Sequence, residues 1–305
     1  MERIDQKGNK LTLLETYDYD NERFRQRVGK DRAASSYVKL LQSRRYVACY
    51  LHDVCQKPDI PLAELTSQFI SDFSTWLSVN RQLRSGTIWL TCQHLKGVVA
   101  RAHQRGWLPI NPFVQFHIAK NIRPREYLTE YELKTLMEHS FSKPQLAYAR
   151  DLFVFAALTG LSFVDLQNLQ ASHLTHFNGE SWIIAQRHKT KVPYQVKLLP
   201  IPQQIMSRYA DKDGGRIFQL PKYRTLADQV QQVMHACGIH KRITLHCARH
   251  TFAILTLNHG VPIESVSRML GHSNITTTQI YARITMQKLD DDMTRFGQQL
   301  RKCLF

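Results

Sequence analysis

Apolar residues in the first part of the chain recur at intervals of three and four, which is the spacing of amphipathic helices. This pattern predicts helices over residues 32–54, 66–79 and 84–107, separated by short connectors that contain proline. Residues 1–20 are polar and weakly patterned, so we expect them to form an N-terminal arm, with a short first element as the alternative. The pattern therefore predicts a small all-helical domain that begins after this arm.

The pattern changes around residue 119. A polar, basic segment is followed by Thr129-x-x-Glu132, a spacing typical of a capping box at a helix start. Next comes an apolar run at 146–158 that indicates a buried helix.

Two short segments then read as strands, residues 181–186 and 194–198, joined by the basic loop 187–191. After Pro200 the pattern is helical again. We predict a mainly α fold with a small antiparallel β-sheet (α+β). Its parts are an arm (1–20), a helical domain (21–118), a linker (119–125), a second domain (126–285) and a C-terminal helix (286–305).

Basic residues outnumber acidic ones, with 41 Lys and Arg against 25 Asp and Glu, and the excess occurs in both halves. Such a charge favours binding to nucleic acid through release of its counterions, although a generic basic protein would also carry it. The candidate DNA contacts are Arg84, Lys96, Arg123, Arg125, Arg187 and Lys191. The chain has no apolar run of about 18 residues that would span a membrane, and its cysteines lack a paired framework. We expect a cytoplasmic protein associated with the nucleoid.

Four side chains between residues 246 and 281 suggest chemistry on a phosphodiester. His246 and Arg249 are three residues apart and share one face of a helix. A guanidinium can bind two phosphate oxygens, and an imidazole can exchange a proton near neutral pH. His272 and Tyr281 add a second imidazole and a phenol that could attack phosphorus.

Two other interpretations of these residues were weighed. A histidine or tyrosine taken singly is more often structural than catalytic, and cysteine and histidine residues between 237 and 250 could form a zinc site. However, His246 and Cys247 are adjacent and point about 100° apart on a helix, and no CxxC pair is present. We therefore expect no metal ion and no other cofactor.

The order of a basic hairpin, His-x-x-Arg-His, Leu-Gly-His and a tyrosine nine residues later resembles the tyrosine recombinases (phage integrase family). The match covers most of residues 125–285, and the preceding helices resemble the core-binding domain of that family. The resemblance implies a site-specific DNA recombinase that works on double-stranded DNA through a 3′-phosphotyrosine and a Holliday junction. The chain would be monomeric when free and tetrameric in the synaptic complex, where an accessory DNA-bending protein can take part.

The resemblance also implies roles for individual residues. Tyr281 would attack the scissile phosphate, Arg249 and His272 would hold its oxygens, and His246 would accept or share a proton. Lys189 matches the hairpin lysine that protonates the departing 5′-oxygen, and Lys191 is the nearby alternative.

One departure from the family lies at Thr159-Gly160-Leu161-Ser162. The family usually has an arginine at the last of these positions, where this chain has Ser162. Ser162 carries no charge, although Asp165 keeps the carboxylate that usually follows. The loss of a bidentate cation should lower the rate by a factor on the order of 10²–10³ unless another residue replaces it. Arg150 and Arg187 are the two candidates, and we favour Arg150, whose guanidinium could reach along its own helix.

Other functions remain open on the sequence alone. A DNA-binding accessory protein disabled at Ser162 and a type IB topoisomerase-like enzyme are the alternatives to a recombinase. An apolar stripe on the last helix could dock on a neighbouring protomer or on its own domain; its members are Leu289, Met293, Phe296 and Leu300. Integration, inversion and dimer resolution are equally compatible with this chemistry.

Overall fold

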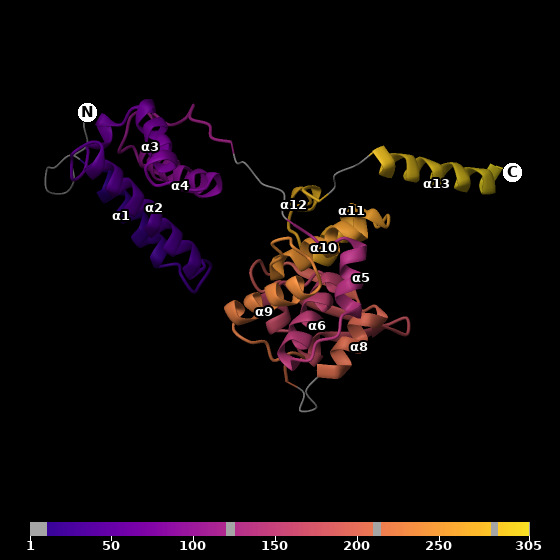
Figure 1. Cartoon of the computed structure of the whole chain (residues 1–305). Coiled ribbons are helices and arrows are strands. Elements are labelled where there is room, and N and C mark those ends of the chain that lie inside the picture. The colour runs from indigo at the N-terminus through magenta and orange to yellow at the C-terminus, as the bar shows by residue number, and fades with distance from the viewer. Residues whose placement is uncertain (1–10, 120–125, 210–214, 282–285, 305) are drawn as a thin grey trace. The chain divides into compact units, whose positions relative to one another are not determined.

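The computed structural model describes residues 11–119, 126–209, 215–281 and 286–304 (Figure 1). Its contacts divide the chain into two units, residues 1–123 and 124–305. Each unit has a hydrophobic core of its own. None of the helices described is both long and apolar enough to cross a bilayer.

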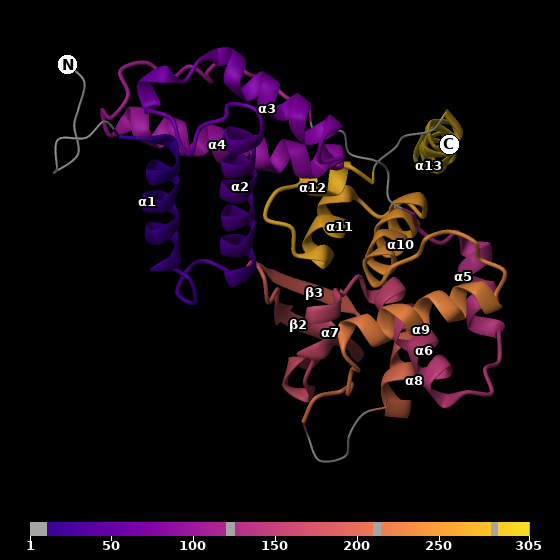
Figure 2. The ribbon, with the colours of Figure 1, turned by 60° about the vertical axis from the view of Figure 1, so that its left-hand side comes forward.

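The first unit is a helical bundle. Its elements are α1 (Leu13–Arg25), α2 (Ala34–Asp53), the 3-10 turn η1 (Leu62–Glu64), α3 (Ser67–Val79) and α4 (Ser85–Gln104). Helices α1 and α2 lie side by side, and α4 packs against both (Figure 2). The apolar faces of α2, α3 and α4 contribute Leu51, Phe73 and Leu95 to one core, where all three side chains are fully buried. The helical domain predicted from the periodicity is present.

The bundle begins earlier than the sequence pattern predicts. Helix α1 occupies most of the segment expected to be an arm, and Leu13 and Tyr17 are fully buried in the core. The amide of Leu13 donates to the carbonyl of Ile60, which ties the helix start to the connector before η1. The arm prediction is therefore wrong for residues 13–20. A stripe of only a few apolar residues among acidic ones gave too weak a periodic signal.

The second unit is built around one central helix. Its helices are α5 (Glu130–Glu138), α6 (Pro144–Thr159), α7 (Phe163–Gln167), η2 (Ala171–His173), α8 (Pro200–Tyr209), α9 (Tyr223–Ala236), α10 (Leu245–Asn258), α11 (Ile263–Leu270), α12 (Thr276–Gln279) and α13 (Met286–Leu304). Helix α6 packs against α5, α8, α9 and α10 (Figure 1). Phe153 and Phe155 of α6 are fully buried, as expected for a helix that is apolar on all sides.

A three-stranded antiparallel sheet completes this unit. Its strands are β1 (Leu174–Phe177), β2 (Glu180–Gln186) and β3 (Pro193–Lys197), in the order β1-β2-β3. Ile183 of β2 faces Val196 of β3, and both side chains are buried. The two predicted strands and the α+β class are confirmed. Strand β1 was not predicted, because three of its four side chains are exposed and give no alternation.

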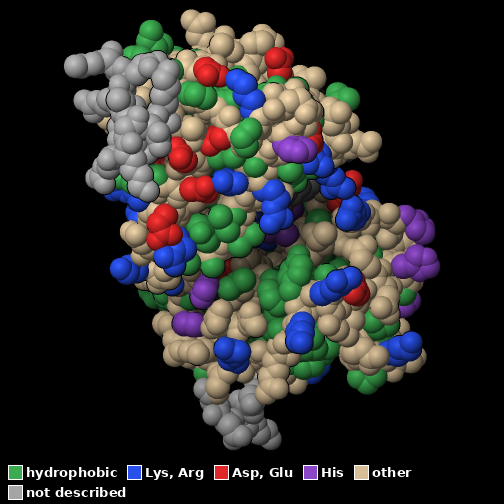
Figure 3. Space-filling model, turned by 90° about the vertical axis from the view of Figure 1, so that its left-hand side faces the viewer, with side chains coloured by type: hydrophobic (Ala, Val, Ile, Leu, Met, Phe, Trp, Pro, Cys, Tyr) green, Lys and Arg blue, Asp and Glu red, His purple; other side chains and the backbone are tan. Residues whose placement is uncertain are grey.

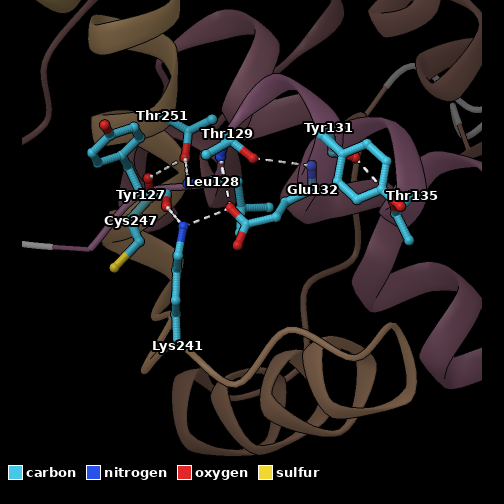
Figure 4. Close-up of polar contacts among 9 residues, drawn as sticks. All are labelled: Tyr127, Leu128, Thr129, Tyr131, Glu132, Thr135, Lys241, Cys247 and Thr251. Atoms are coloured by element: carbon cyan, nitrogen blue, oxygen red, sulfur yellow. Dashed lines mark hydrogen bonds and ion pairs between the residues drawn. The ribbon is translucent and has the colours of Figure 1, made fainter.

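The start of this unit is fastened to α10, the helix that carries two of the candidate catalytic residues (Figure 4). The predicted capping box forms: the amide of Glu132 donates to Thr129 Oγ1 at 3.2 Å, and the amide of Thr129 donates to Glu132 Oε2 at 2.8 Å. Glu132 also pairs with the ammonium of Lys241 at 2.7 Å. Beside it the amide of Leu128 donates to Thr251 Oγ1 of α10 at 2.9 Å.

Candidate active site

Arg249 lies at the centre of the candidate site and is 3% exposed. Its Nη1 donates to the carbonyl of Gly160 at 2.8 Å, and its Nη2 donates to the carbonyl of Leu270. The guanidinium thus joins α10 to the ends of α6 and α11. Burial, followed by repulsion from Arg187, lowers the pKa of Arg249 to about 9, so it remains a cation at neutral pH.

Both of these carbonyls lie next to turns that require glycine. Gly160 ends α6 with φ +72°, and a Cβ there would lie 2.7 Å from a ring carbon of Phe252. Gly271 ends α11 with φ +59°, and a Cβ there would lie 2.7 Å from Cγ of Arg187. A positive φ is strained for other residues, so these two glycines fix where each helix stops beside Arg249.

His272 follows Gly271 and is half-buried. Its Nδ1 is hydrogen-bonded to Thr278 Oγ1 at 2.8 Å, which orients the ring. Burial, then the positive charges of Arg249 and Arg187, lower the pKa of His272 to about 4. The imidazole is therefore neutral at neutral pH in the DNA-free protein. A bound phosphate would offset the same repulsion.

Tyr281 lies beside α10 of the same chain. Its ring centroid is 5.0 Å from that of His250, which in turn is 4.6 Å from the ring of His246. Its phenol is near enough to Arg249 to raise the pKa of that guanidinium by Coulomb attraction. The structure thus brings together the four residues that the sequence pattern selected. His250, whose role the motif left open, lies buried between the rings of His246 and Tyr281.

The basic hairpin presents two exposed lysines, Lys189 and Lys191, in the turn between β2 and β3. The turn is closed by Arg187, whose amide donates to the carbonyl of Val192 and whose carbonyl accepts from the amide of Lys191, both at 2.8 Å. Lys191 has φ +57°, so the chain reverses direction there.

Asp165 holds this hairpin against the start of α7. Its carboxylate accepts a hydrogen bond from Ser162 Oγ at 2.6 Å and another from the amide of His188 at 3.1 Å. The same carboxylate forms an ion pair with Nε of Arg187 at 3.1 Å, in which the Asp165 side chain is 2% exposed. Ser162 therefore orients Asp165 and lies beside a guanidinium that comes from another element.

The hypothesis that Arg150 takes the place of the missing arginine is wrong. Arg150 Nε donates to Asp151 Oδ1 at 2.8 Å, and Nη1 donates to the carbonyl of His139 at 2.7 Å. Its guanidinium lies over the ring of Phe141. Arg150 is nine residues before Thr159, or about 13 Å along the helix axis. Near the middle of α6, the buried carboxylate of Asp151 holds the guanidinium of Arg150 away from Ser162.

Comparison with known proteins identifies the family to which this chain belongs. Residues 126–288 match the family model of the phage integrase family, and residues 12–118 match that of the phage integrase SAM-like domain. The chain belongs to the phage integrase family. The resemblance to tyrosine recombinases inferred from the motifs is thereby confirmed.

Relatives in this family include the tyrosine recombinase XerC of Lactobacillus leichmannii, 24% identical over 227 residues that cover 70% of this chain and 77% of the relative. The tyrosine recombinase XerD of Listeria monocytogenes is 25% identical over 209 residues, 63% of this chain and 69% of the relative.

Solved structures of family members share the fold. The Tn1549 transposon integrase in complex with circular intermediate DNA has a TM-score of 0.73 and 17% identity over 93% of this chain and 99% of that one. A lambda integrase dimer bound to a COC′ core site has a TM-score of 0.71 and 17% identity over 91% of this chain and 80% of the other.

The structure supports some of the DNA contacts expected from the sequence and not others. Arg84 is exposed at the start of α4. Lys96 is half-buried, and its ammonium donates to the carbonyl of Phe116 within its own unit, so we no longer include it among the contacts. Arg123 and Arg125 lie outside the described residues.

Sequence reasoning missed a basic groove of about 880 Å³ on the first unit, formed by α1, α2 and α4. The arginines that line it are Arg23, Arg27, Arg32, Arg101 and Arg105. Asp20, whose side chain is 5% exposed, pairs with Arg101 at 2.8 Å and with Arg105 at 2.7 Å and so orients both. The signal in the sequence that could have indicated this groove is the i, i+4 spacing of Arg101 and Arg105. Figure 3 shows Lys and Arg side chains distributed over one face of the molecule.

The zinc alternative is not supported by the described residues. Among them, no group of three cysteine, histidine or acidic side chains lies close enough to hold a metal ion.

Proposed function

We propose that this chain is a site-specific DNA recombinase that cleaves and rejoins double-stranded DNA through a 3′-phosphotyrosine. The observation that supports this most is the convergence of Tyr281 and His272 on the buried guanidinium of Arg249. Relatives named as tyrosine recombinases, and family structures bound to DNA, support the same activity.

In the cleavage step the phenolic oxygen of Tyr281 attacks the scissile phosphorus. An O–P bond forms, and the bond from phosphorus to the 5′-oxygen breaks. The phenolic proton passes to His246, and Lys189 gives a proton to the departing 5′-oxygen. The phosphotyrosine retains the energy of the diester. A 5′-hydroxyl from the partner strand can therefore reverse the step without ATP.

Arg249 and His272 stabilise the charge on the non-bridging oxygens. Arg249 is held by two carbonyls before DNA arrives, so little reorganisation is needed. His272 is neutral in the free protein and can donate a hydrogen bond or take up a proton as the phosphate raises its pKa. Asp165 positions the hairpin through the amide of His188.

Both units would contact one duplex. The arginine groove on the first unit supplies phosphate contacts, and the hairpin lysines supply contacts near the scissile bond. Helix α13 exposes an apolar stripe that fits a neighbouring protomer in a tetramer on DNA: Leu289, Met293, Phe296 and Leu300. The reaction takes place with the DNA in the cytoplasm.

The test is capture of a covalent adduct. The protein is mixed with sheared genomic DNA from the organism that encodes it, and DNA that stays attached to protein in detergent is sequenced. Tyr281→Phe is the matched control, because it keeps the ring contact with His250 and removes only the nucleophilic oxygen. We expect specific fragments with the wild-type protein alone. Equal recovery with both proteins would overturn the proposal and favour a DNA-binding accessory protein.

The captured fragments also distinguish the biological outcomes. Sites at the ends of a mobile element indicate integration, inverted sites around one segment indicate inversion, and a single chromosomal site indicates resolution.

A further inference from the structure

We propose that Arg187, from the β2–β3 hairpin, is the second phosphate-binding arginine of this active site and takes the place of the arginine that Ser162 lacks. This rests on the proposed recombinase function and names one further catalytic residue for it. Three independent features of the structure support it.

The first feature is the way the guanidinium is held. Nε of Arg187 pairs with Asp165 at 3.1 Å, and Nη1 donates to the carbonyl of Leu270 at 3.2 Å. The side chain of Arg187 is 14% exposed, so most of it is fixed inside the protein. The contact of Nε with Asp165 is an ion pair and not a hydrogen bond, and one terminal nitrogen donates to Leu270, so the other terminal N–H groups can bind a phosphoryl oxygen. Ser162, at the position where the family has arginine, donates a hydrogen bond to the carboxylate of Asp165 and helps to orient that carboxylate.

The second feature is the proximity of two cations. Arg187 and Arg249 both donate to the carbonyl of Leu270, so their guanidinium groups lie side by side. Burial is the main reason that the pKa values of Arg249 and His272 are lowered, and repulsion from Arg187 lowers both of them further. Asp165 is one carboxylate for two guanidinium groups. A bound anion would reduce the repulsion between these positive charges, and the scissile phosphate is such an anion.

The third feature is the space made for the side chain. The stem of Arg187 passes over Gly271, where any Cβ would lie 2.7 Å from Cγ and 3.1 Å from Cδ of Arg187. The glycine between Leu270 and His272 therefore has two functions. It ends α11, and it lets an arginine from the hairpin reach the groups around Arg249.

A purely structural role for Arg187, in which it only fastens the hairpin that carries Lys189, makes a different prediction. Loss of a structural clamp would impair cleavage whatever the charge of the phosphate. Loss of a cation that neutralises the phosphate would matter only while the phosphate carries its charge. A scissile methylphosphonate, in which a methyl group replaces one non-bridging oxygen, separates the two.

The experiment compares Arg187→Gln with wild type on nicked duplexes of the captured site that carry either a phosphate or a methylphosphonate at the scissile position. Arg150→Gln is the matched control, because it also removes an arginine from a buried aspartate in the same unit. On phosphate we expect adduct formation by Arg187→Gln to fall by about 10²–10³-fold and that of Arg150→Gln to stay near wild type. On methylphosphonate we expect Arg187→Gln to approach the wild-type rate.

A second readout needs no DNA. The pKa of His272, followed by NMR of labelled imidazole, should rise in Arg187→Gln and not in Arg150→Gln. The proposal is overturned if Arg187→Gln cleaves the phosphate duplex like wild type, or if it is equally impaired on both substrates. Failure of the wild-type protein to form any adduct would instead refute the proposed function.

Discussion

Replacement of Asp165 by asparagine isolates the contact that aims Arg187. The Asp165 side chain is 2% exposed, and it pairs with an arginine that is 14% exposed. Breaking a buried ion pair costs about 3–5 kcal/mol. Asparagine keeps a carbonyl oxygen for Ser162 or the His188 amide, and these bonds are each worth about 1 kcal/mol. We therefore expect Asp165→Asn to lower the free energy of unfolding by about 2–4 kcal/mol.

The assay is urea denaturation of the intact chain without DNA, in which the unfolding of the second unit is followed. Asp165→Asn, Arg187→Gln and the double variant are compared in a double-mutant cycle. Because the two side chains form one pair, the double variant should lose about as much stability as the worse single variant, not the sum. The adduct-forming rate should show the same non-additivity. Full additivity of the two losses, or a change in unfolding free energy below about 0.5 kcal/mol for Asp165→Asn, would refute the assigned pair.

Three further outcomes are expected. The folded-state pKa of His272 is about 4, below its ordinary value, so the unfolded state takes up a proton at a higher pH than the folded state. The free energy of unfolding should therefore fall as the pH drops from about 6.5 toward 4. This decline should be shallower in His272→Asn. Gly271→Ala should impair cleavage and lower stability by at least about 1 kcal/mol, from the strain at positive φ and the displacement of Arg187; unchanged melting and activity would contradict the close approach. Arg101→Gln should reduce the salt dependence of DNA binding, measured as the slope of log affinity against log salt, by about 1, and an unchanged slope would remove the groove from the DNA interface.

Much of the local structure could be predicted because it depends on neighbours in sequence. The capping box at Thr129 and Glu132 forms through hydrogen bonds between residues three apart. The central helix α6 was predicted from its apolar residues, which are unbroken over residues 152–158. By contrast, strand β1 could not be predicted, since it is held by pairing with β2 while three of its four side chains remain exposed. Helix α1 likewise depends on burial against the connector near Ile60.

The sequence by itself determined the family of this chain and selected four candidate site residues, because the order and spacing of His246, Arg249, His272 and Tyr281 are local features of the chain. It also showed that a cation was missing at Ser162. Only the tertiary structure led to the proposal that Arg187 replaces it. Arg150 is captured by the adjacent Asp151, whereas Arg187 meets Asp165 and the carbonyl of Leu270, 83 residues away in sequence. Contacts over such separations depend on how α7, α11 and the hairpin pack together, and no local pattern of residues specifies that packing.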